Sequence, residues 1–246
     1  VIIKPSEHTP TSATLLAKVV AEIDASAGIV NVLHGKGPMS VGEMIAAHPG
    51  IDAVTFTGSS ATGSKIMEVA SKSLKPLSFE LGGKNAAIVF SDADIEAAVK
   101  GVVRSVFSNS GQICLCTERV YVQQDIFDSF VSRLTEAVQA LSFDESSEKS
   151  LTLGPLISRD QRDKVMSYFD LAIKEGATAI IGGAVPHFGD ERDDGFYLQP
   201  TVFTGVPKHS RFVREEIFGP VCHIEKFTTE EEVIAASNDT SFGLAA

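Results

Sequence analysis

The sequence predicts an α/β protein made of two successive units that meet near Gly82 and Gly83. Short runs rich in β-branched residues alternate with helical patterns of about 10–15 residues, which is typical of βαβ units around a parallel sheet. This alternation begins again after the two glycines. Apolar residues make up 43% of the 246 positions, so the chain can bury a substantial core.

In the first unit, residues 1–82, apolar residues that recur every three or four positions indicate helices. The runs between them are short and rich in β-branched residues, and they indicate strands. Helices are expected over 11–23, 40–48 and 60–74, and strands over 1–3, 29–35, 53–58 and 76–80.

The second unit, residues 83–246, opens with a strand that ends before Ser91. Ser91 or Asp92 is predicted as the N-cap of the next helix, because a short polar side chain there can accept a bond from a free backbone N–H. Residues 187–195 are acidic and are expected to form an exposed loop. Helices are predicted over 91–109, 125–141, 159–176 and 229–238, and strands over 119–123, 178–183, 197–203 and 221–227.

Composition and charge exclude several classes of protein. The formal net charge of −11 disfavours nucleic acid as a partner, although it leaves a nucleotide cofactor open. No apolar run approaches the roughly 20 residues of a membrane-spanning helix. Three cysteines do not make a disulfide framework, so a reducing, cytoplasmic compartment is expected. Because the sequence opens on "VIIKPSE" and closes on "SFGLAA", we expect a piece of a longer protein.

The motif "KPSE" contains Lys4, Ser6 and Glu7 and directly follows a predicted strand. At the carboxyl end of such a strand, an acidic side chain can accept hydrogen bonds from a ribose diol, and an ammonium group can donate to it. A carboxylate there also repels a 2′-phosphate, which favours NAD over NADP. The alternative is a solvated charged loop whose turn is set by Pro5.

The motif "FTGSSATG" (residues 56–63) lies between a predicted strand and a predicted helix. Gly58 and Gly63 allow a close approach of backbone or phosphate, and Ser59 with the first amides of the helix can hold a pyrophosphate. The motif matches neither the G-x-G-x-x-G fingerprint nor a P-loop. A glycine-bounded turn that serves packing alone remains the alternative.

In "FELGGK" (residues 79–84), Glu80 stands between Phe79 and Leu81. Apolar neighbours that desolvate a carboxyl raise its pKa and suit it to work as a general base. The alternative is a carboxylate at a strand end that points to water.

In "GQICLC" (residues 111–116), Cys114 follows a predicted helix and a short turn. A loop at a sheet edge can expose a thiol, and nearby backbone amides can lower its pKa and bind an oxyanion. A metal site would need further ligands, which are missing because there is no second cysteine pair and no histidine nearby. A redox pair is more usually C-x-x-C, so Cys116 and Cys222 are best explained as buried structural thiols.

In "REEIFGPV" (residues 214–221), Glu215 and Glu216 are most simply explained as a solvated helix start and Phe218 as core. An aromatic side chain beside a Gly-Pro turn can instead form the wall of a pocket for a planar cofactor.

Taken together and in this order, these five motifs resemble the aldehyde dehydrogenase superfamily across essentially the whole chain. The 34-residue step from Glu80 to Cys114 agrees with that family's spacing between general base and nucleophile. The resemblance implies a partial Rossmann-type NAD-binding domain over 1–82 and a partial α/β catalytic domain over 83–246. It makes Cys114 the nucleophile and Glu80 the base. It also implies NAD contacts from Lys4, Ser6, Glu7, Gly58, Ser59, Gly63, Leu81, Glu216 and Phe218.

The resemblance implies oxidation of a small aldehyde to an acid through a thiohemiacetal and a thioester on Cys114. "GQICLCTERVYV" with "GPLIS…KVMSYF" is similar to the branch that oxidises 2-aminomuconate or 2-hydroxymuconate semialdehydes. The alternatives are a generic aliphatic or betaine-type enzyme and a catalytically silent nucleotide-binding fragment. The family also implies a homodimer or homotetramer for the parent enzyme. Because the family's oxyanion-hole Asn lies outside these residues, we expect little activity from this polypeptide alone.

Overall fold

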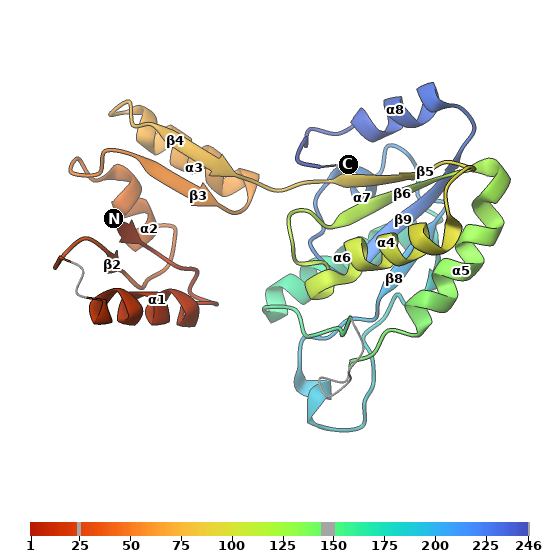
Figure 1. The fold of residues 1–246 in the computed structure, drawn as a ribbon, viewed down its shortest axis with the longest axis horizontal. Coiled ribbons are helices and arrows are strands. Elements are labelled where there is room, and N and C mark those ends of the chain that lie inside the picture. Colours follow the sequence, from red (N-terminus) through yellow and green to blue (C-terminus); the bar gives the residue numbers. More distant parts are fainter. Residues whose placement is uncertain (24–25, 144–150, 246) are drawn as a thin grey trace. The chain divides into compact units, whose positions relative to one another are not determined.

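The computed structural model describes residues 1–23, 26–143 and 151–245 (Figure 1). The chain divides into two compact units, Val1–Leu81 and Gly82–Ala246. Both units are α/β, with mainly parallel strand pairing, as the sequence predicts. Within the described residues, no helix is long and apolar enough to cross a membrane.

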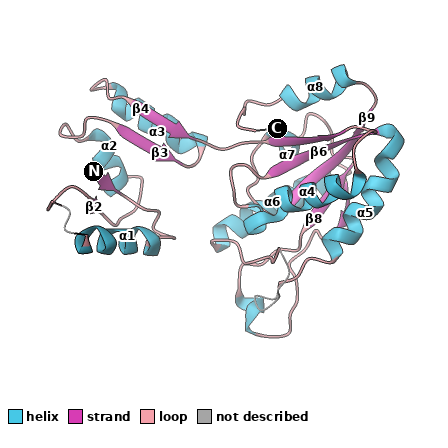
Figure 2. Cartoon of the chain, viewed as in Figure 1, coloured by secondary structure: helices cyan, strands magenta, loops and turns pink. Residues whose placement is uncertain are grey.

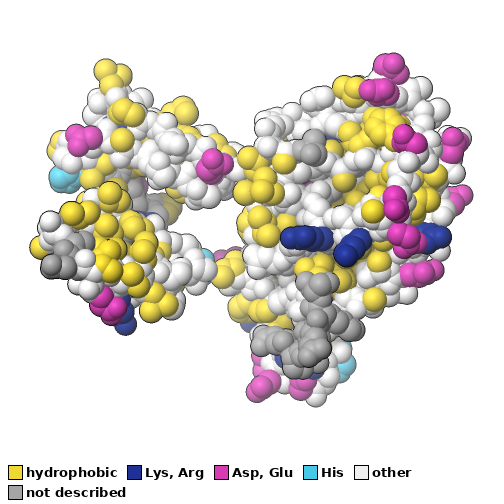
Figure 3. Space-filling model, viewed as in Figure 1, with side chains coloured by type: hydrophobic (Ala, Val, Ile, Leu, Met, Phe, Trp, Pro, Cys, Tyr) yellow, Lys and Arg dark blue, Asp and Glu magenta, His cyan; other side chains and the backbone are white. Residues whose placement is uncertain are grey.

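The first unit contains two separate pairs of short parallel strands. Helix α1 (Thr11–Glu22) has no buried residue, and Leu15, Leu16 and Val19 are each about half exposed. Figure 3 shows hydrophobic side chains gathered over this helix. The strand pairs are β1 (Ile2–Ile3) with β2 (Asn31–Val32) and β3 (Val54–Thr57) with β4 (Leu77–Glu80), and the helices are α1 (Thr11–Glu22), α2 (Val41–Ala47) and α3 (Ser60–Ser71).

The second unit is built on a five-stranded sheet in the order β5-β6-β9-β8-β7 (Figure 2). Every neighbouring pair is parallel except β7 and β8. The strands are β5 (Asn85–Val89), β6 (Thr117–Gln123), β9 (Val221–Phe227), β8 (Thr201–Thr204) and β7 (Thr178–Ile181). The strand predicted over 197–203 is wrong at its start, since Pro200 has no N–H to give to a ladder and β8 begins after it.

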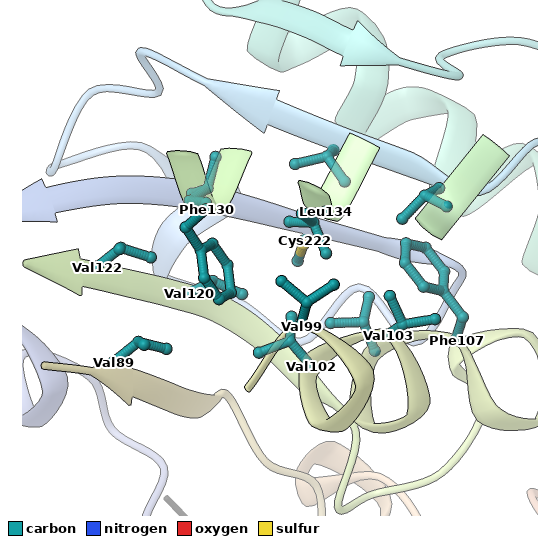
Figure 4. Close-up of a cluster of buried hydrophobic side chains, with 14 of the residues drawn as sticks. Val89, Val99, Val102, Val103, Phe107, Val120, Val122, Phe130, Leu134 and Cys222 are labelled. Atoms are coloured by element: carbon teal, nitrogen blue, oxygen red, sulfur yellow. The ribbon is translucent and has the colours of Figure 1, made fainter. Parts of the chain in front are cut away.

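Helices cover both faces of this sheet. The larger core lies between α4 (Ile95–Phe107), α5 (Phe127–Gln139) and one face, where Val102, Val120 and Cys222 meet (Figure 4). A second core on the other face packs α6 (Arg159–Lys174) and α7 (Arg211–Arg214) against β8 and β9. The last helix is α8 (Glu230–Asn238), and short 3₁₀ turns are η1 (Ser108–Gly111), η2 (Gln124–Ile126) and η3 (Glu191–Asp194).

The N-cap of α4 differs from the prediction. Asp94 is the cap, and its Oδ1 accepts a bond from the backbone N–H of Ala97 at 3.1 Å. Ser91 and Asp92 lie in the turn before the helix, where the N–H of Ser91 donates to the side chain of Gln123. A cap acts from the residue directly before the first helical turn, and Asp94 holds that position ahead of Ile95.

Candidate active site

The loop that carries Cys114 connects η1 to β6 in the second unit. Asn109, Ser110 and Gly111 have φ values of 50°, 55° and 73°, so three successive residues adopt left-handed backbone conformations and turn the chain sharply. A Cβ at Gly111 would overlap the carbonyl oxygen of Gly219, so only glycine fits there. The turn leaves the Cys114 side chain half-buried.

Gly83 and Asn85, which follow Glu80 and Leu81 in the sequence, support this loop. The side-chain amide of Asn85 donates to the carbonyl oxygens of Cys114 and Cys116, at 2.7 Å and 2.9 Å. A Cβ at Gly83 would lie 2.8 Å from the Cys114 carbonyl oxygen, which is closer than real Cβ atoms approach. The stretch from Gly82 to Asn85 therefore supports the cysteine loop, and we call it the seat of this loop.

The three cysteines are free thiols in different surroundings. Burial raises the pKa of Cys116 to about 11 and that of Cys222 to about 12, so both stay protonated at neutral pH. Cys114 is the partly exposed one. Neighbouring Cys222 and His223 face opposite sides of β9, and no group of metal-binding side chains occurs among the described residues.

The segment after α7 approaches the same region. Helix α7 ends at Arg214, so the predicted helix start at Glu215 and Glu216 is wrong. Glu215 instead accepts hydrogen bonds from Arg211 and from the hydroxyl of Tyr168. The helix ends there because Glu215 has an extended backbone conformation.

Glu216 is half-buried, and its Oε1 accepts a bond from the backbone N–H of Gly83 at 3.1 Å. A Cβ at Gly82 would overlap this carboxylate, so the first glycine of the pair leaves it room. Burial raises the pKa of Glu216, and the bond from Gly83 opposes that rise. Phe218 is not core, because it is only partly buried, whereas Ile217 is fully buried. The backbone of Phe218 has a φ of 63°.

A buried ion pair lies next to this segment. Lys84 and Glu118 form it, and the Glu118 carboxylate also accepts bonds from the backbone N–H groups of Ile217 and Phe218. Sequence reasoning missed both residues. The signal available was a charged residue at the start of each of two apolar strand patterns, in "KNAAIVF" and "ERVYV".

In the first unit, an open cavity of about 460 Å³ is lined by Ser6 and Glu7 together with residues of α1 and the segment after β2. The ammonium group of Lys4 donates to the carbonyl oxygens of Pro5 and Gly35 at 2.6 Å and 2.8 Å. It also lies 3.9 Å from Glu7 Oε2. The "KPSE" segment is thus a tied turn at the edge of a cavity.

The turn between β3 and α3 contains Gly58, Ser59 and Gly63. A Cβ at Gly58 would lie 2.5 Å from the Phe56 ring, and the N–H of Gly58 donates to the carbonyl of Glu80. Ser59 caps α3 by accepting the N–H of the residue at position 62. At Gly63 a Cβ would lie 2.8 Å from Leu81 Cδ2, so the packing of Leu81 against α3 requires this glycine.

Glu80 is the last residue of β4 and has an exposed side chain. The expected desolvation of Glu80 is therefore wrong, and the alternative of a strand-end carboxylate that points to water describes the side chain. Phe79 cannot cover it, because adjacent residues of a strand face opposite sides. Phe79 packs edge-on against Phe56, with ring centroids 6.2 Å apart, on the other face.

The fold and this loop define an α/β protein in which a half-buried cysteine lies at the amino-terminal edge of the five-stranded sheet, where β5, β6 and β9 begin. The chain belongs to the aldehyde dehydrogenase family, whose model matches residues 1–246. It is 55% identical over its full length to the 2-aminomuconic 6-semialdehyde dehydrogenase of Pseudomonas sp. It is 48% identical to the 2-hydroxymuconic semialdehyde dehydrogenase of Pseudomonas sp. strain CF600. The chain spans 50% and 51% of these two proteins.

Solved structures give the same family. The betaine aldehyde dehydrogenase of Staphylococcus aureus in complex with NAD⁺ is 37% identical with a TM-score of 0.92, over 98% of this chain and 48% of that one. The lactaldehyde dehydrogenase of Escherichia coli is 42% identical with a TM-score of 0.92, over 99% of this chain and 50% of that one. The predicted family and fold class are therefore confirmed.

Proposed function

We propose that the parent enzyme oxidises an aldehyde to a carboxylic acid with NAD, and that Cys114 is its nucleophile. The observation that carries this proposal is the contrast among the three thiols. Cys114 is half-buried on a loop fixed by Asn85, whereas Cys116 and Cys222 are buried and held protonated. A nucleophile must be both accessible and positioned, and Cys114 meets both conditions.

In the proposed reaction, the Cys114 thiolate attacks the aldehyde carbonyl and forms a thiohemiacetal alkoxide. Backbone amides near Cys114 stabilise this oxyanion. Collapse of the alkoxide expels a hydride and leaves a thioester on Cys114. Glu80, whose exposed carboxylate ends β4, then activates the water that hydrolyses the thioester and releases the acid.

The described residues fit a dinucleotide. Glu7 lines an open cavity and offers a carboxylate for a ribose diol. In the second unit, the half-buried Glu216 offers another carboxylate. The amides at the start of α3, preceded by Gly58 and Ser59, suit a pyrophosphate. When bound, NAD supplies the hydride acceptor. The assigned contacts are Lys4, Ser6, Glu7, Gly58, Ser59, Gly63, Leu81, Glu216 and Phe218.

We further propose a muconate-type semialdehyde as substrate, an NAD-binding role for residues 1–82 and a catalytic role for 83–246. The identities of 55% and 48% to two muconic semialdehyde dehydrogenases support this substrate. Betaine aldehyde dehydrogenases follow at 41–43% identity, and a betaine-type substrate is therefore the second candidate. A substrate panel of one semialdehyde carboxylate and one quaternary-ammonium aldehyde separates the two. Faster turnover of betaine aldehyde would contradict the muconate proposal.

The nucleophile is tested in the full-length parent enzyme by Cys114→Ala, with Cys116→Ala as the matched control. We expect Cys114→Ala to abolish NADH formation while NAD still binds, and Cys116→Ala to retain activity. Equal activity of both variants would show that the nucleophile is wrongly assigned. For the base, Glu80→Gln is expected to give one rapid turnover per chain and then stall, because thioester hydrolysis fails. A normal steady-state rate in that variant would reject Glu80 as the base.

A further inference from the structure

The ion pair of Lys84 and Glu118 is buried almost completely, with 1% and 4% of the two residues exposed. Lys84 directly precedes β5, and Glu118 is the second residue of β6. A buried charge pair contributes little net stability compared with well-packed apolar residues of the same size. Its contacts therefore have to be explained by something other than the strength of the core.

The Glu118 carboxylate is fully engaged. Its Oε1 accepts the backbone N–H groups of Ile217 and Phe218 at 3.0 Å and 2.9 Å, and its Oε2 accepts the N–H of Ile217 at 3.1 Å and the Lys84 ammonium. From the opposite side, the side-chain amide of Gln161 donates to the carbonyl oxygens of Ile217 and Phe218, at 3.1 Å and 2.8 Å. The backbone N–H and C=O groups of both residues are thus hydrogen-bonded to side chains, and the peptide group between them is held at both ends.

The conformation held in this way is an unfavourable one. Phe218 has a φ of 63°, a left-handed backbone that side chains with a Cβ adopt only when the surroundings enforce it. Strained residues of this kind concentrate at ligand-binding sites. The residue before the clamped pair is Glu216, and the backbone of Gly83, next to Lys84, donates to its carboxylate.

We propose that Lys84 and Glu118 are positioning residues, which hold Glu216 and Phe218 in the conformation that receives the cofactor. This inference rests on the proposed function, since it takes Glu216 and Phe218 as the contacts to the nicotinamide ribose. The carboxylate provides the acceptors that the Ile217–Phe218 backbone needs, and Lys84 balances its charge. Burial lowers the pKa of Lys84, and the adjacent Glu118 carboxylate opposes this shift.

The pair also connects the proposed cofactor segment, residues 216–218, to the cysteine loop, residues 112–116. Glu118 lies four residues after Cys114 in the chain, and Gly83 beside Lys84 approaches the Cys114 carbonyl so closely that a Cβ would lie 2.8 Å from its oxygen. One buried carboxylate thereby sets the distance between two segments that have to act on the same substrate.

The test uses Glu118→Gln and the double variant Lys84→Met/Glu118→Met, with Arg119→Met as the matched control. Glu118→Gln turns one acceptor into a donor, and the double variant removes both charges together, so no unpaired charge stays buried. Arg119 follows Glu118 in the same strand and is equally buried, and its guanidinium donates to the backbone carbonyl oxygens of Lys84, at 2.7 Å, and of Ala236 and Ser237, at the end of α8. None of these bonds involves the Glu118 carboxylate or the backbone of Ile217 and Phe218. Its loss disturbs the same unit without touching the clamped backbone.

Two readouts separate positioning from general stability. Amide hydrogen exchange, read by mass spectrometry, measures the protection of the Ile217 and Phe218 N–H groups, and calorimetric titration with NAD measures the dissociation constant. Against Arg119→Met, we expect both Glu118 variants to exchange these amides at least about tenfold faster and to bind NAD about tenfold more weakly, which corresponds to about 1.4 kcal/mol.

Exchange equal to that of Arg119→Met would overturn the inference, and so would NAD affinity within about twofold of that control. If the wild-type protein itself binds no NAD, the proposed function fails, and the exchange rates alone still decide whether the pair fixes this segment. Should Glu118→Gln fail to fold, the double variant gives the same two measurements.

Discussion

Asn85 offers a direct measure of how firmly the nucleophile loop is seated. Its side-chain amide donates to the carbonyl oxygens of Cys114 and Cys116, and its Oδ1 accepts the N–H of Ala245 at 3.0 Å. Asn85→Asp keeps the shape and the acceptor toward Ala245, but it replaces the donor with a carboxylate oxygen. The substitution therefore perturbs the two contacts to the cysteine loop and little else.

The expected magnitude follows from those two contacts. Each hydrogen bond contributes about 0.5–1.5 kcal/mol net, and a buried group left without a partner costs about 1–3 kcal/mol. We therefore expect Asn85→Asp to lower the free energy of unfolding by about 2–4 kcal/mol. The assay is urea unfolding followed by far-ultraviolet circular dichroism, because the chain has no Trp.

A matched control is Asn238→Asp, whose amide donates to the Ile234 carbonyl at an exposed site. Exposed substitutions of this kind change stability by about 0.5 kcal/mol or less. Lowering the pH provides a second check on Asn85→Asp. The two carbonyls favour the protonated carboxyl, so its folded-state pKa is raised and the stability deficit shrinks as the pH falls toward about 4. A deficit no larger than that of Asn238→Asp would refute the proposed seat of the loop.

Three further outcomes follow from single positions. Gly83→Ala should destabilise the protein in thermal unfolding and slow turnover, because its Cβ would press on the loop that carries Cys114. The control is Gly101→Ala in α4, where a Cβ meets open space and the change should be neutral or stabilising by up to about 1 kcal/mol. Burial lowers the pKa of His223 to about 3. The contribution of this neutral side chain to stability is therefore complete above about pH 6.5 and is lost as the pH falls through about 3. His223→Phe should flatten the acid side of a stability–pH curve. Cys116 and Cys222, with raised pKa values, should stay unmodified by iodoacetamide at about pH 8 while one thiol per chain reacts.

Much of the fold could be predicted because it depends on local periodicity. Helix α1 and strand β9 lie where apolar spacing and β-branched runs placed them. The errors had both local and distant causes. The run over 197–203 has strand composition, but only the part after Pro200 can join the ladder. The acidic pair after Arg214 has the composition of a helix start, yet its carboxylates accept hydrogen bonds from the Tyr168 hydroxyl and the Gly83 N–H, both far away in sequence.

The candidate site was predicted only as far as motifs reveal it. Cys114 could be singled out because a short turn precedes it in a fixed motif. Its supports could not, since Asn85 is 29 positions away in the chain and Glu118 reaches Ile217 across 99 positions. Side chains that hold a backbone from another segment leave no periodicity, and only the buried charges beside apolar strands hinted at them.

Close contacts between segments explain why so many glycines surround the site. Gly82 makes room for the Glu216 carboxylate, Gly83 for the Cys114 carbonyl, and Gly111 for the carbonyl of Gly219. Gly219 in turn packs against Val165 of α6, where a Cβ would lie 2.6 Å from a methyl group. Each of these glycines stands where two segments of the second unit come closer than any side chain permits. Gly111 is required by the approach of the cysteine loop to the segment after α7, and Gly82, Gly83 and Gly219 by the contacts that hold those two segments. Adding a methyl group to Gly111 should therefore push the two segments apart.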